Sequence, residues 1–283
     1  MSSVPTSRIA LVTGANQGLG LALVGGLCRE LGTGGTVYLT ARNAERGQEA
    51  CARLKGEGLS PLFLSLDVTD SASVQAAAEA VRSRHGGIDI VIQNAAARIT
   101  KDVPQSEQVE GFIDTNNHGT LRLLEAFTPL LRDNARLIVV ASSFGSLRNL
   151  DPRLHARFEG DGLTLQGVER ALDDYVVAVR AGTAQSAGWP DWINVPSKVG
   201  QVASVRVLAG DKAAEFRRRG ILINAACPGL IDTEASRPWF DDMSSAATPD
   251  EAAKDVIWLA TLPTGTTEPY GELVRHRKPR AWK

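Results

Sequence analysis

The chain has 283 residues, of which 43% are hydrophobic and 22% charged, a composition that excludes an intrinsically disordered protein and leaves enough apolar material for a packed core. The 31 Lys and Arg residues nearly balance the 32 Asp and Glu residues, so the net charge of −1 offers no dense basic stripe for a nucleic acid. We therefore expect a small-molecule partner and no nucleic acid.

Neither the apolar runs nor the cysteines point to a membrane or to a metal. No stretch approaches the roughly 18 apolar residues of a membrane-spanning helix, so we expect no membrane partner. The three cysteines, Cys28, Cys51 and Cys227, lie far apart in the sequence and predict neither a metal site nor a disulfide framework. A reducing, cytoplasmic location fits this cysteine usage best.

Short runs rich in Val, Ile and Leu alternate with longer segments of helical periodicity. The predicted strands are Ile9–Thr13, Thr36–Thr40, Leu62–Leu66, Ile88–Ile92, Arg136–Ala141 and Ile221–Ala225. The predicted helices are Leu19–Leu31, Asn43–Leu54 and Ala72–Arg84, with Asn43 and Asp70 as N-caps, and Leu121–Leu131. Because wholly apolar strands are buried on both faces, we predict an α/β fold with a Rossmann-type, doubly wound parallel sheet.

The strand signal is interrupted once, between Ser146 and Pro190. Charged stretches with helical character, Leu154–Glu159 and Val168–Arg180, occupy this region. We interpret it as a helical insertion after the fifth strand and treat residues 1–283 as a single domain. The basic tail, His276–Lys283, is predicted to be a solvated terminus.

The first strand leads into Thr13-Gly14-Ala15-Asn16-Gln17-Gly18-Leu19-Gly20, which opens the first helix. Glycines at this spacing permit a tight turn and let the backbone approach a pyrophosphate, which rests against the free N–H groups of the helix start. Isolated glycine patterns are weak signals, but the strand before this one and the helix after it supply the required context. We therefore predict a dinucleotide site that includes Gly14, Asn16, Gln17, Gly18, Leu19 and Gly20.

The end of the second strand carries an arginine where an acidic residue would hold a ribose 2′-hydroxyl. Arg42, followed by Arg46 one turn later, is suited to a 2′-phosphate and favours NADP(H) over NAD. Asp67 closes the third strand and either accepts from an adenine amino group, beside Val68, or caps the next helix.

These motifs together resemble those of the short-chain dehydrogenase/reductases, and among them the monomeric carbonyl reductases. The resemblance extends over nearly the whole chain. Its further motifs are Gln93-Asn94-Ala95-Ala96, Asn116 in Thr115–Thr120, Ala141-Ser142-Ser143, Gly188-Trp189-Pro190, Cys227–Thr233, Gly271–Val274 and the terminal Arg280-Ala281-Trp282.

The resemblance implies NADPH, hydride delivery to a carbonyl carbon, and a role for each matching residue. Ser143 would hydrogen-bond the carbonyl oxygen, Lys198 would bind the nicotinamide ribose, and Asn116 would support a water and Lys198. The remaining cofactor contacts that it implies are Asn94, Ala95, Pro228, Gly229, Ile231 and Thr233. The insertion implies a monomer, because such helices cover the surface that otherwise pairs subunits.

The family's catalytic tyrosine, four residues before the lysine, is replaced here by Asn194. A carboxamide can donate a hydrogen bond to a substrate oxygen, but it cannot titrate near neutral pH. Losing a positioned acid typically costs about 10²- to 10⁴-fold in rate. Weak candidates for a substitute acid are Tyr175, Asp191, Asp232, Glu234 and His118, although packing, capping or solvated roles suit these residues better. We interpret Cys227 as a small buried residue and not as a nucleophile.

Three hypotheses follow. The first is an NADPH-dependent reductase of a carbonyl, an imine or an activated alkene, in which Ser143 and Asn194 hold the substrate and water supplies the proton. The second is an NADP(H)-binding pseudoenzyme or regulatory module. The third is a non-redox cyclase or isomerase on the same fold.

Overall fold

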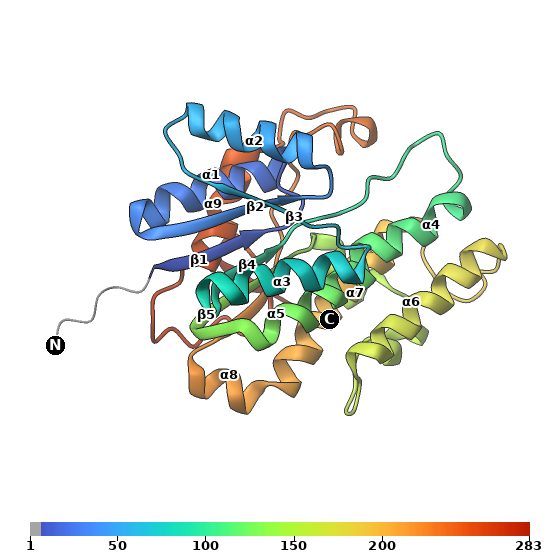
Figure 1. Cartoon of the computed structure of the whole chain (residues 1–283). Coiled ribbons are helices and arrows are strands. Elements are labelled where there is room, and N and C mark those ends of the chain that lie inside the picture. Colours follow the sequence, from blue (N-terminus) through green and yellow to red (C-terminus); the bar gives the residue numbers. More distant parts are fainter. Residues whose placement is uncertain (1–6) are drawn as a thin grey trace.

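The protein is built on an eight-stranded sheet, with strand order β3-β2-β1-β4-β5-β6-β7-β8, in a computed structural model that describes residues 7–283 (Figure 1). Neighbouring strands are parallel except for β7 and β8, which are antiparallel. The strands are β1 (Arg8–Val12), β2 (Gly35–Ala41), β3 (Leu62–Ser65), β4 (Ile88–Gln93), β5 (Leu131–Val140), β6 (Leu222–Ala226), β7 (Leu273–Arg275) and β8 (Lys278–Arg280). The six predicted strands and the doubly wound α/β class are confirmed.

The apolar strands are buried on both faces because each face packs against its own layer of helices. In β1, for example, Ile9 and Leu11 join one core cluster, while Ala10 and Val12 join the other. This alternation is what the period of two in a strand requires of a sheet that is covered on both sides.

Figure 1 shows the two helical layers on either side of the sheet. One layer consists of α1 (Gly18–Leu31), α2 (Ala44–Gly56) and α9 (Pro249–Ala260). The opposite layer consists of α3 (Ser71–His85), α5 (Gly119–Phe127), α7 (Asn194–Asp211) and α8 (Ala213–Arg219). The two predicted N-caps are confirmed, since Asn43 accepts from the Arg46 backbone N–H and Asp70 from that of Ala72, both at 2.9 Å.

The insertion forms a third apolar cluster beside the sheet. Its main helix, α6 (Leu165–Arg180), packs against α4 (Gln105–Ile113) and α7, as seen at the side of the molecule in Figure 1. The predicted helical stretch at Leu154–Glu159 is a 3₁₀ helix over Pro152–Arg157. Within residues 7–283, no helix is both long enough and apolar enough to span a bilayer.

One predicted helix end is wrong, and the tail has structure that the sequence did not indicate. The helix predicted to reach Leu131 ends at Phe127, because Thr128-Pro129-Leu130 turns into a 3₁₀ helix and Leu131 already starts β5. The tail is exposed to solvent as predicted, apart from Trp282, but it is also fixed in place: β8 pairs with β7, and the Trp282 carbonyl accepts from the Leu147 N–H at 2.8 Å. The tail is therefore fastened beside the segment that follows β5.

Candidate active site

The direction of strand order reverses between β1 and β4, and parallel sheets bind ligands outside the carboxyl ends of strands at such a point. The two strand ends are tied together by Thr13 and Asn94. The Thr13 hydroxyl accepts from the backbone N–H groups of Asn94 and Ala95, each at 2.9 Å. The Asn94 amide donates to the carbonyls of Thr13 and Gly14, at 2.9 and 3.1 Å. Asn94 therefore shapes the glycine turn directly.

Each glycine of the turn is favoured over other residues for its own physical reason. A Cβ on Gly14 would lie 2.7 Å from the Ala95 Cα, and one on Gly20 would lie 2.5 Å from the Gly14 carbonyl oxygen. Gly18 has a φ of +54°, which side-chain-bearing residues rarely adopt, and only the Thr233 methyl group approaches its Cβ position, at 3.7 Å. The close packing of Gly14 and Gly20 thus leaves open space at Gly18.

The start of α1 is free to receive an anion. Its N-cap, Gln17, provides no side-chain hydrogen bond to the first turn, so free N–H groups and the positive end of the helix dipole face the glycine turn. Asn16 and Leu19 flank this position in the chain. A helix start of this kind fits a phosphate group.

Arg42 and Arg46 follow the carboxyl end of β2 and are exposed. Within the described part of the chain, neither forms an ion pair or donates a side-chain hydrogen bond, so both guanidinium groups are available to a phosphate. Asp67 accepts from the Thr69 N–H and hydroxyl, at 3.0 and 2.8 Å, through one carboxylate oxygen. This is a local turn contact and not a helix cap, because the N-cap of α3 is Asp70. Val68, beside Asp67, is buried.

The segment after β6 approaches the glycine turn from the other side. Gly229 has a φ of +83°, and Pro228 precedes it in the half-buried loop. Ile231 pairs with Ala247 in an isolated bridge, while Thr233 contributes the methyl group near Gly18. The fold thus brings three predicted cofactor segments that are distant from one another in the sequence to one edge of the sheet.

Lys198 is buried, and this burial lowers the pKa of its amine to about 8. Its Nζ donates to the Gln201 Oε1 at 2.8 Å and to the Val140 carbonyl at 3.4 Å. The Gln201 amide in turn donates to the Asn116 carbonyl at 3.0 Å. The side chain of Gln201 therefore connects Asn116 to Lys198.

Gln201 is a residue that the sequence reasoning missed. It is buried, and its amide also lies 3.3 Å from the Thr120 hydroxyl. The Asn116 side chain is held separately, since its Oδ1 accepts from the Ala97 N–H at 2.8 Å. Neighbouring groups therefore hold Gln201, Asn116 and Lys198 in a defined arrangement.

Ser143 and Asn194 lie on two segments that pack against each other. Ser143 begins the 3₁₀ turn Ser143–Gly145, in which a Cβ on Gly145 would lie 3.0 Å from the Lys198 carbonyl oxygen. Asn194 is the first residue of α7, one turn before Lys198. Neither the Ser143 hydroxyl nor the Asn194 carboxamide has a hydrogen-bond partner in the described residues, so both can bind a ligand.

Of the candidate substitute acids, Tyr175 is buried and two carboxylates are paired with arginines. Tyr175 is completely buried, its ring lies 4.8 Å from that of Trp189, and burial raises the pKa of its phenol above the ordinary value. Asp232 pairs with Arg237 at 2.7 Å, which lowers the pKa of that carboxyl, and Glu234 pairs with Arg98 at 3.2 Å. Asp191 is exposed at the entrance to α7, and Cys227 is buried as expected.

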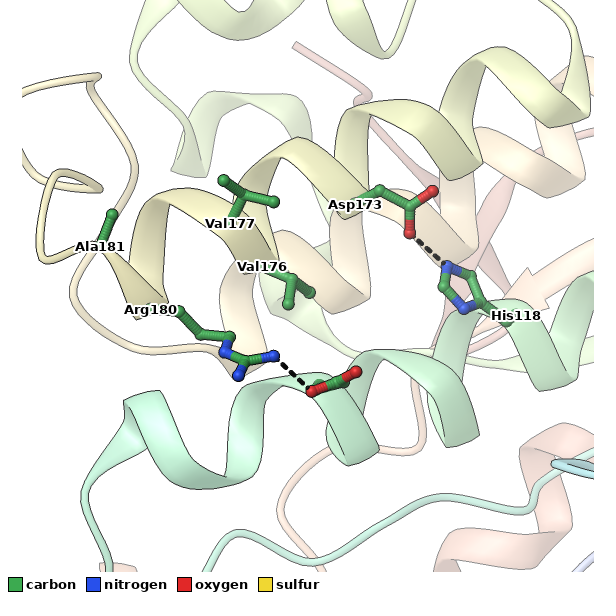
Figure 2. Close-up of a pocket in the computed structure, with 7 residues that line it drawn as sticks. His118, Asp173, Val176, Val177, Arg180 and Ala181 are labelled. Atoms are coloured by element: carbon green, nitrogen blue, oxygen red, sulfur yellow. Dashed lines mark hydrogen bonds and ion pairs between the residues drawn. The ribbon is translucent and has the colours of Figure 1, made fainter.

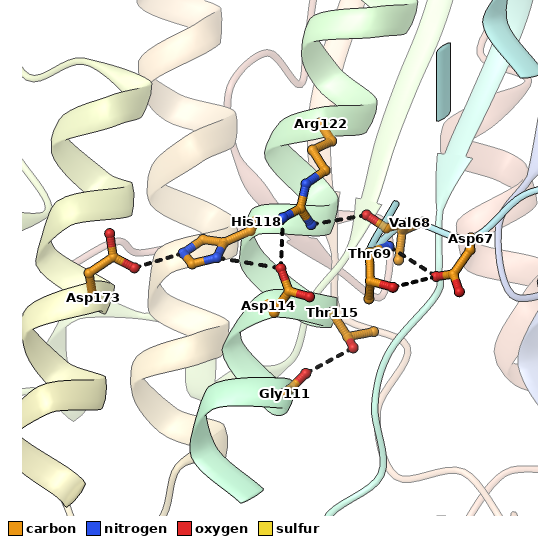
Figure 3. Close-up of polar contacts among 9 residues, drawn as sticks. All are labelled: Asp67, Val68, Thr69, Gly111, Asp114, Thr115, His118, Arg122 and Asp173. Carbon is orange, nitrogen blue, oxygen red and sulfur yellow. Dashed lines mark hydrogen bonds and ion pairs between the residues drawn. The ribbon is translucent and has the colours of Figure 1, made fainter. Parts of the chain in front are cut away.

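His118 belongs to a separate charged cluster. Figure 3 shows it between two carboxylates, with its ring nitrogens 3.6 Å from Asp114 and 3.0 Å from Asp173 on α6. Arg122 pairs with the same Asp114 at 2.8 Å. His118 therefore links the insertion to the π-helical turn Asp114–His118.

An open cavity of about 530 Å³ lies between α4 and α6, and it is not the predicted site. Figure 2 shows His118 and Asp173 at one end and Arg180 at the other. Arg180 pairs there with Glu110 at 2.7 Å. None of the predicted cofactor residues lines this cavity. The seam between α6 and its neighbours is thus distinct from the site at the sheet edge.

Comparisons with known proteins agree with this geometry. The family model described as short chain dehydrogenase matches residues 8–151. Rat carbonyl reductase (NADPH) 3 is 34% identical over 280 residues, covering 98% of this chain and 99% of the rat protein. Human carbonyl reductase (NADPH) 1 is 33% identical over 279 residues, covering 97% and 98%.

Solved structures give the same result. Salutaridine reductase from Papaver somniferum superposes with a TM-score of 0.79 and 26% identity, covering 94% of this chain and 99% of that one. Menthone neomenthol reductase from Mentha piperita gives a TM-score of 0.77 and 28% identity, covering 95% and 98%. The likeness therefore extends over nearly the whole chain.

Proposed function

Because this chain belongs to the short chain dehydrogenase family, we propose that it is an NADPH-dependent reductase whose substrate is a carbonyl compound, an imine or an activated alkene. For a ketone the balance is one ketone, one NADPH and one proton giving one secondary alcohol and NADP⁺. The names of the relatives, carbonyl reductase (NADPH), support both the reaction class and the cofactor.

The residues at the sheet edge fit the cofactor. The glycine turn and the uncapped start of α1 would hold its pyrophosphate, and Arg42 with Arg46 would hold the 2′-phosphate. Asp67 and Val68 would lie at the adenine, and Asn94, Ala95, Pro228, Gly229, Ile231 and Thr233 along the nicotinamide end. When bound, NADPH supplies the hydride.

The chain's own residues bind the substrate oxygen and the charge that develops on it. The Ser143 hydroxyl donates one hydrogen bond to this oxygen, and the Asn194 carboxamide donates a second. Lys198 is protonated at neutral pH, since its pKa is about 8, and it contributes a fixed positive charge to the site. The proton that completes an alcohol comes from water, because Asn194 has none to release.

One observation supports this proposal most strongly. The buried amine of Lys198 is hydrogen-bonded to Gln201, the backbone of Lys198 lies against the Ser143 turn, and the carboxamide of Asn194 is one helical turn away. The experiment is Asn194→Tyr, with Asn194→Phe as the matched control that adds a ring without an acid. We expect the tyrosine to raise ketone reduction by about 10²-fold or more, and the phenylalanine to give no gain.

The outcomes separate two candidate functions. Substantial turnover by the native chain, with a further gain in Asn194→Tyr, supports the reductase. NADPH binding without turnover, in both the native chain and Asn194→Tyr, contradicts it and supports an NADP(H)-binding regulatory module. The second function is favoured by one observation: Tyr175, Asp232 and Glu234 are all engaged away from Asn194.

We also propose that the chain acts as a monomer on a small-molecule substrate. The surface of α4 and α7 is covered by α6, which is held there by the His118–Asp173 and Arg180–Glu110 pairs. A cytoplasmic location accords with the three free cysteines. Sedimentation analysis tests the monomer, and a stable dimer would contradict it.

A further inference from the structure

A second cavity, of about 90 Å³, lies beside Ser143 at the carboxyl ends of β6 and β7. Ser143 and Ser146 line it from the segment after β5, and Cys227 and Leu273 from the sheet. The remaining wall consists of three arginines and Ala281, namely Arg148, Arg275, Arg280 and Ala281. The tail that was expected to be solvated thus contributes part of a cavity next to a proposed substrate-binding hydroxyl.

The lining is positively charged and contains no acidic side chain. Arg148 is occupied by the protein itself, because its Nε donates to the Ser146 hydroxyl at 3.1 Å and its Nη2 to the Lys283 carbonyl at 3.2 Å. Within residues 7–283, Arg275 and Arg280 form no ion pair. The Nε of Arg275 is buried with no hydrogen-bond partner.

A buried guanidinium nitrogen without an acceptor is unfavourable, and a bound anion would satisfy it. Other exposed arginines of this region are paired, as Arg277 is with Asp255 at 3.1 Å. Arg275 and Arg280, which line the cavity, form no such pair within the described residues. Arg275 also approaches Gly229, with its Nη2 4.0 Å from where a Cβ would lie.

We propose that this cavity binds a carboxylate of the substrate, with Arg275 as the principal ligand and Arg280 as the second, so that the physiological substrate is an oxo acid. The inference rests on the proposed reductase function and names its substrate class. A carboxylate matches the planar, forked donors of a guanidinium. Its binding beside Ser143 would hold the reducible group of the same molecule at the Ser143 hydroxyl.

The first experiment compares oxo acids with their methyl esters. The acids are ketones whose carboxylate lies two to about five carbons from the carbonyl, because an arginine side chain is long and flexible enough to reach a carboxylate over this range. The readout is the ratio of kcat/KM for the acid to kcat/KM for its ester. In Arg275→Met we expect this ratio to fall by about tenfold or more, through a rise in KM for the acid. Arg280→Met should lower it less, and the charge-matched control Arg277→Met should leave it unchanged.

Equal losses for acid and ester in Arg275→Met would overturn the inference while leaving the reductase function intact. A native chain that reduces esters and rejects every acid would overturn it as well. If neither acids nor esters are reduced, the function fails, and the binding measurement below decides the cavity by itself.

The second experiment measures binding without turnover, by calorimetric titration of the full chain with benzoate and, as a neutral control, benzamide. We expect benzoate to bind more tightly than benzamide, and Arg275→Met to weaken benzoate by about tenfold or more. NADPH affinity should be the same in Arg275→Met and Arg277→Met. If benzoate binds equally well to the native chain and to Arg275→Met, the proposal is overturned. If Arg275→Met also loses NADPH affinity, Arg275 binds a cofactor phosphate, and the proposal is overturned as well.

Discussion

Replacing Gln201 with leucine removes the short hydrogen bond that Lys198 makes, with little change in side-chain volume. The Lys198 amine keeps only the Val140 carbonyl, at 3.4 Å, after losing the Gln201 oxygen at 2.8 Å. A hydrogen bond to a charged group is worth about 1.5–3 kcal/mol, which corresponds to a pKa change of roughly 1 to 2 units. Because the lost bond favours the protonated form, the pKa of Lys198 should fall from about 8 to between roughly 6 and 7.

The assay is a ¹³C NMR titration of the lysine Cε signals, with Lys198 assigned by its loss in Lys198→Met. Gln201→Glu is the opposite perturbation, since a carboxylate next to the ammonium should raise the same pKa. Gln75→Leu, on the exposed face of α3, is the matched control and should leave it unchanged. A Lys198 titration midpoint that is identical in Gln201→Leu and the native chain would refute the reasoning.

Stability should follow the same linkage. The pKa of Lys198, about 8 when folded, lies below the ordinary lysine value of 10.5, so the unfolded chain binds the proton more tightly. Stability should therefore increase as the pH rises from about 8 toward 10.5. In Gln201→Leu the stability loss relative to the native chain should be larger at pH 6 than at about pH 9, where the native amine is mostly neutral. Urea unfolding at the two pH values measures this, and a loss that is independent of pH argues against a charged Lys198–Gln201 bond.

Two further substitutions test the glycine turn and the buried tyrosine. In Gly20→Ala the new methyl group would lie 2.5 Å from the Gly14 carbonyl oxygen. We therefore expect the free energy of unfolding, measured in urea, to fall by about 1–3 kcal/mol and NADPH to bind more weakly. The control is Gly34→Ala, which has open space around it and should leave NADPH affinity unchanged. Tyr175→Phe removes a buried hydroxyl that has no partner in the described residues, so the free energy of unfolding should stay the same or rise by about 1 kcal/mol, with turnover unaffected. A large loss of turnover in this variant would identify Tyr175 as an acid.

The sheet was predictable because each strand is apolar on both faces. Ile9 and Leu11 pack in one core cluster, and Ala10 and Val12 pack in the other. Together they form an uninterrupted apolar run, which is expected only for a strand that is covered on both faces. The glycine turn was equally visible, because its spacing between a strand and a helix is a local pattern, even though the contact that requires Gly14 is with the distant Ala95. Features of this kind depend on neighbours in the sequence.

The missed features depend on contacts between distant segments. Gln201 is one polar residue in a helix, and its role appears only when Asn116 and Lys198 converge on it. The pairing of β8 with β7 involves strands of three residues each, too short to give a periodic signal. The turn after Phe127 was signalled by Pro129, which the helical pattern of the preceding leucines obscured.

The central claim is that the glycine turn and Arg42 hold NADPH, and calorimetric titration tests it most directly. The native chain should bind NADPH in preference to NADH. The variant Arg42→Asp should lose or reverse this preference, with NADPH binding weakened by about tenfold or more. The reason is that a charge-assisted hydrogen bond to the 2′-phosphate is lost and an acidic residue takes its place. Equal affinity for the two nucleotides in both proteins, or no binding of either, would contradict the account.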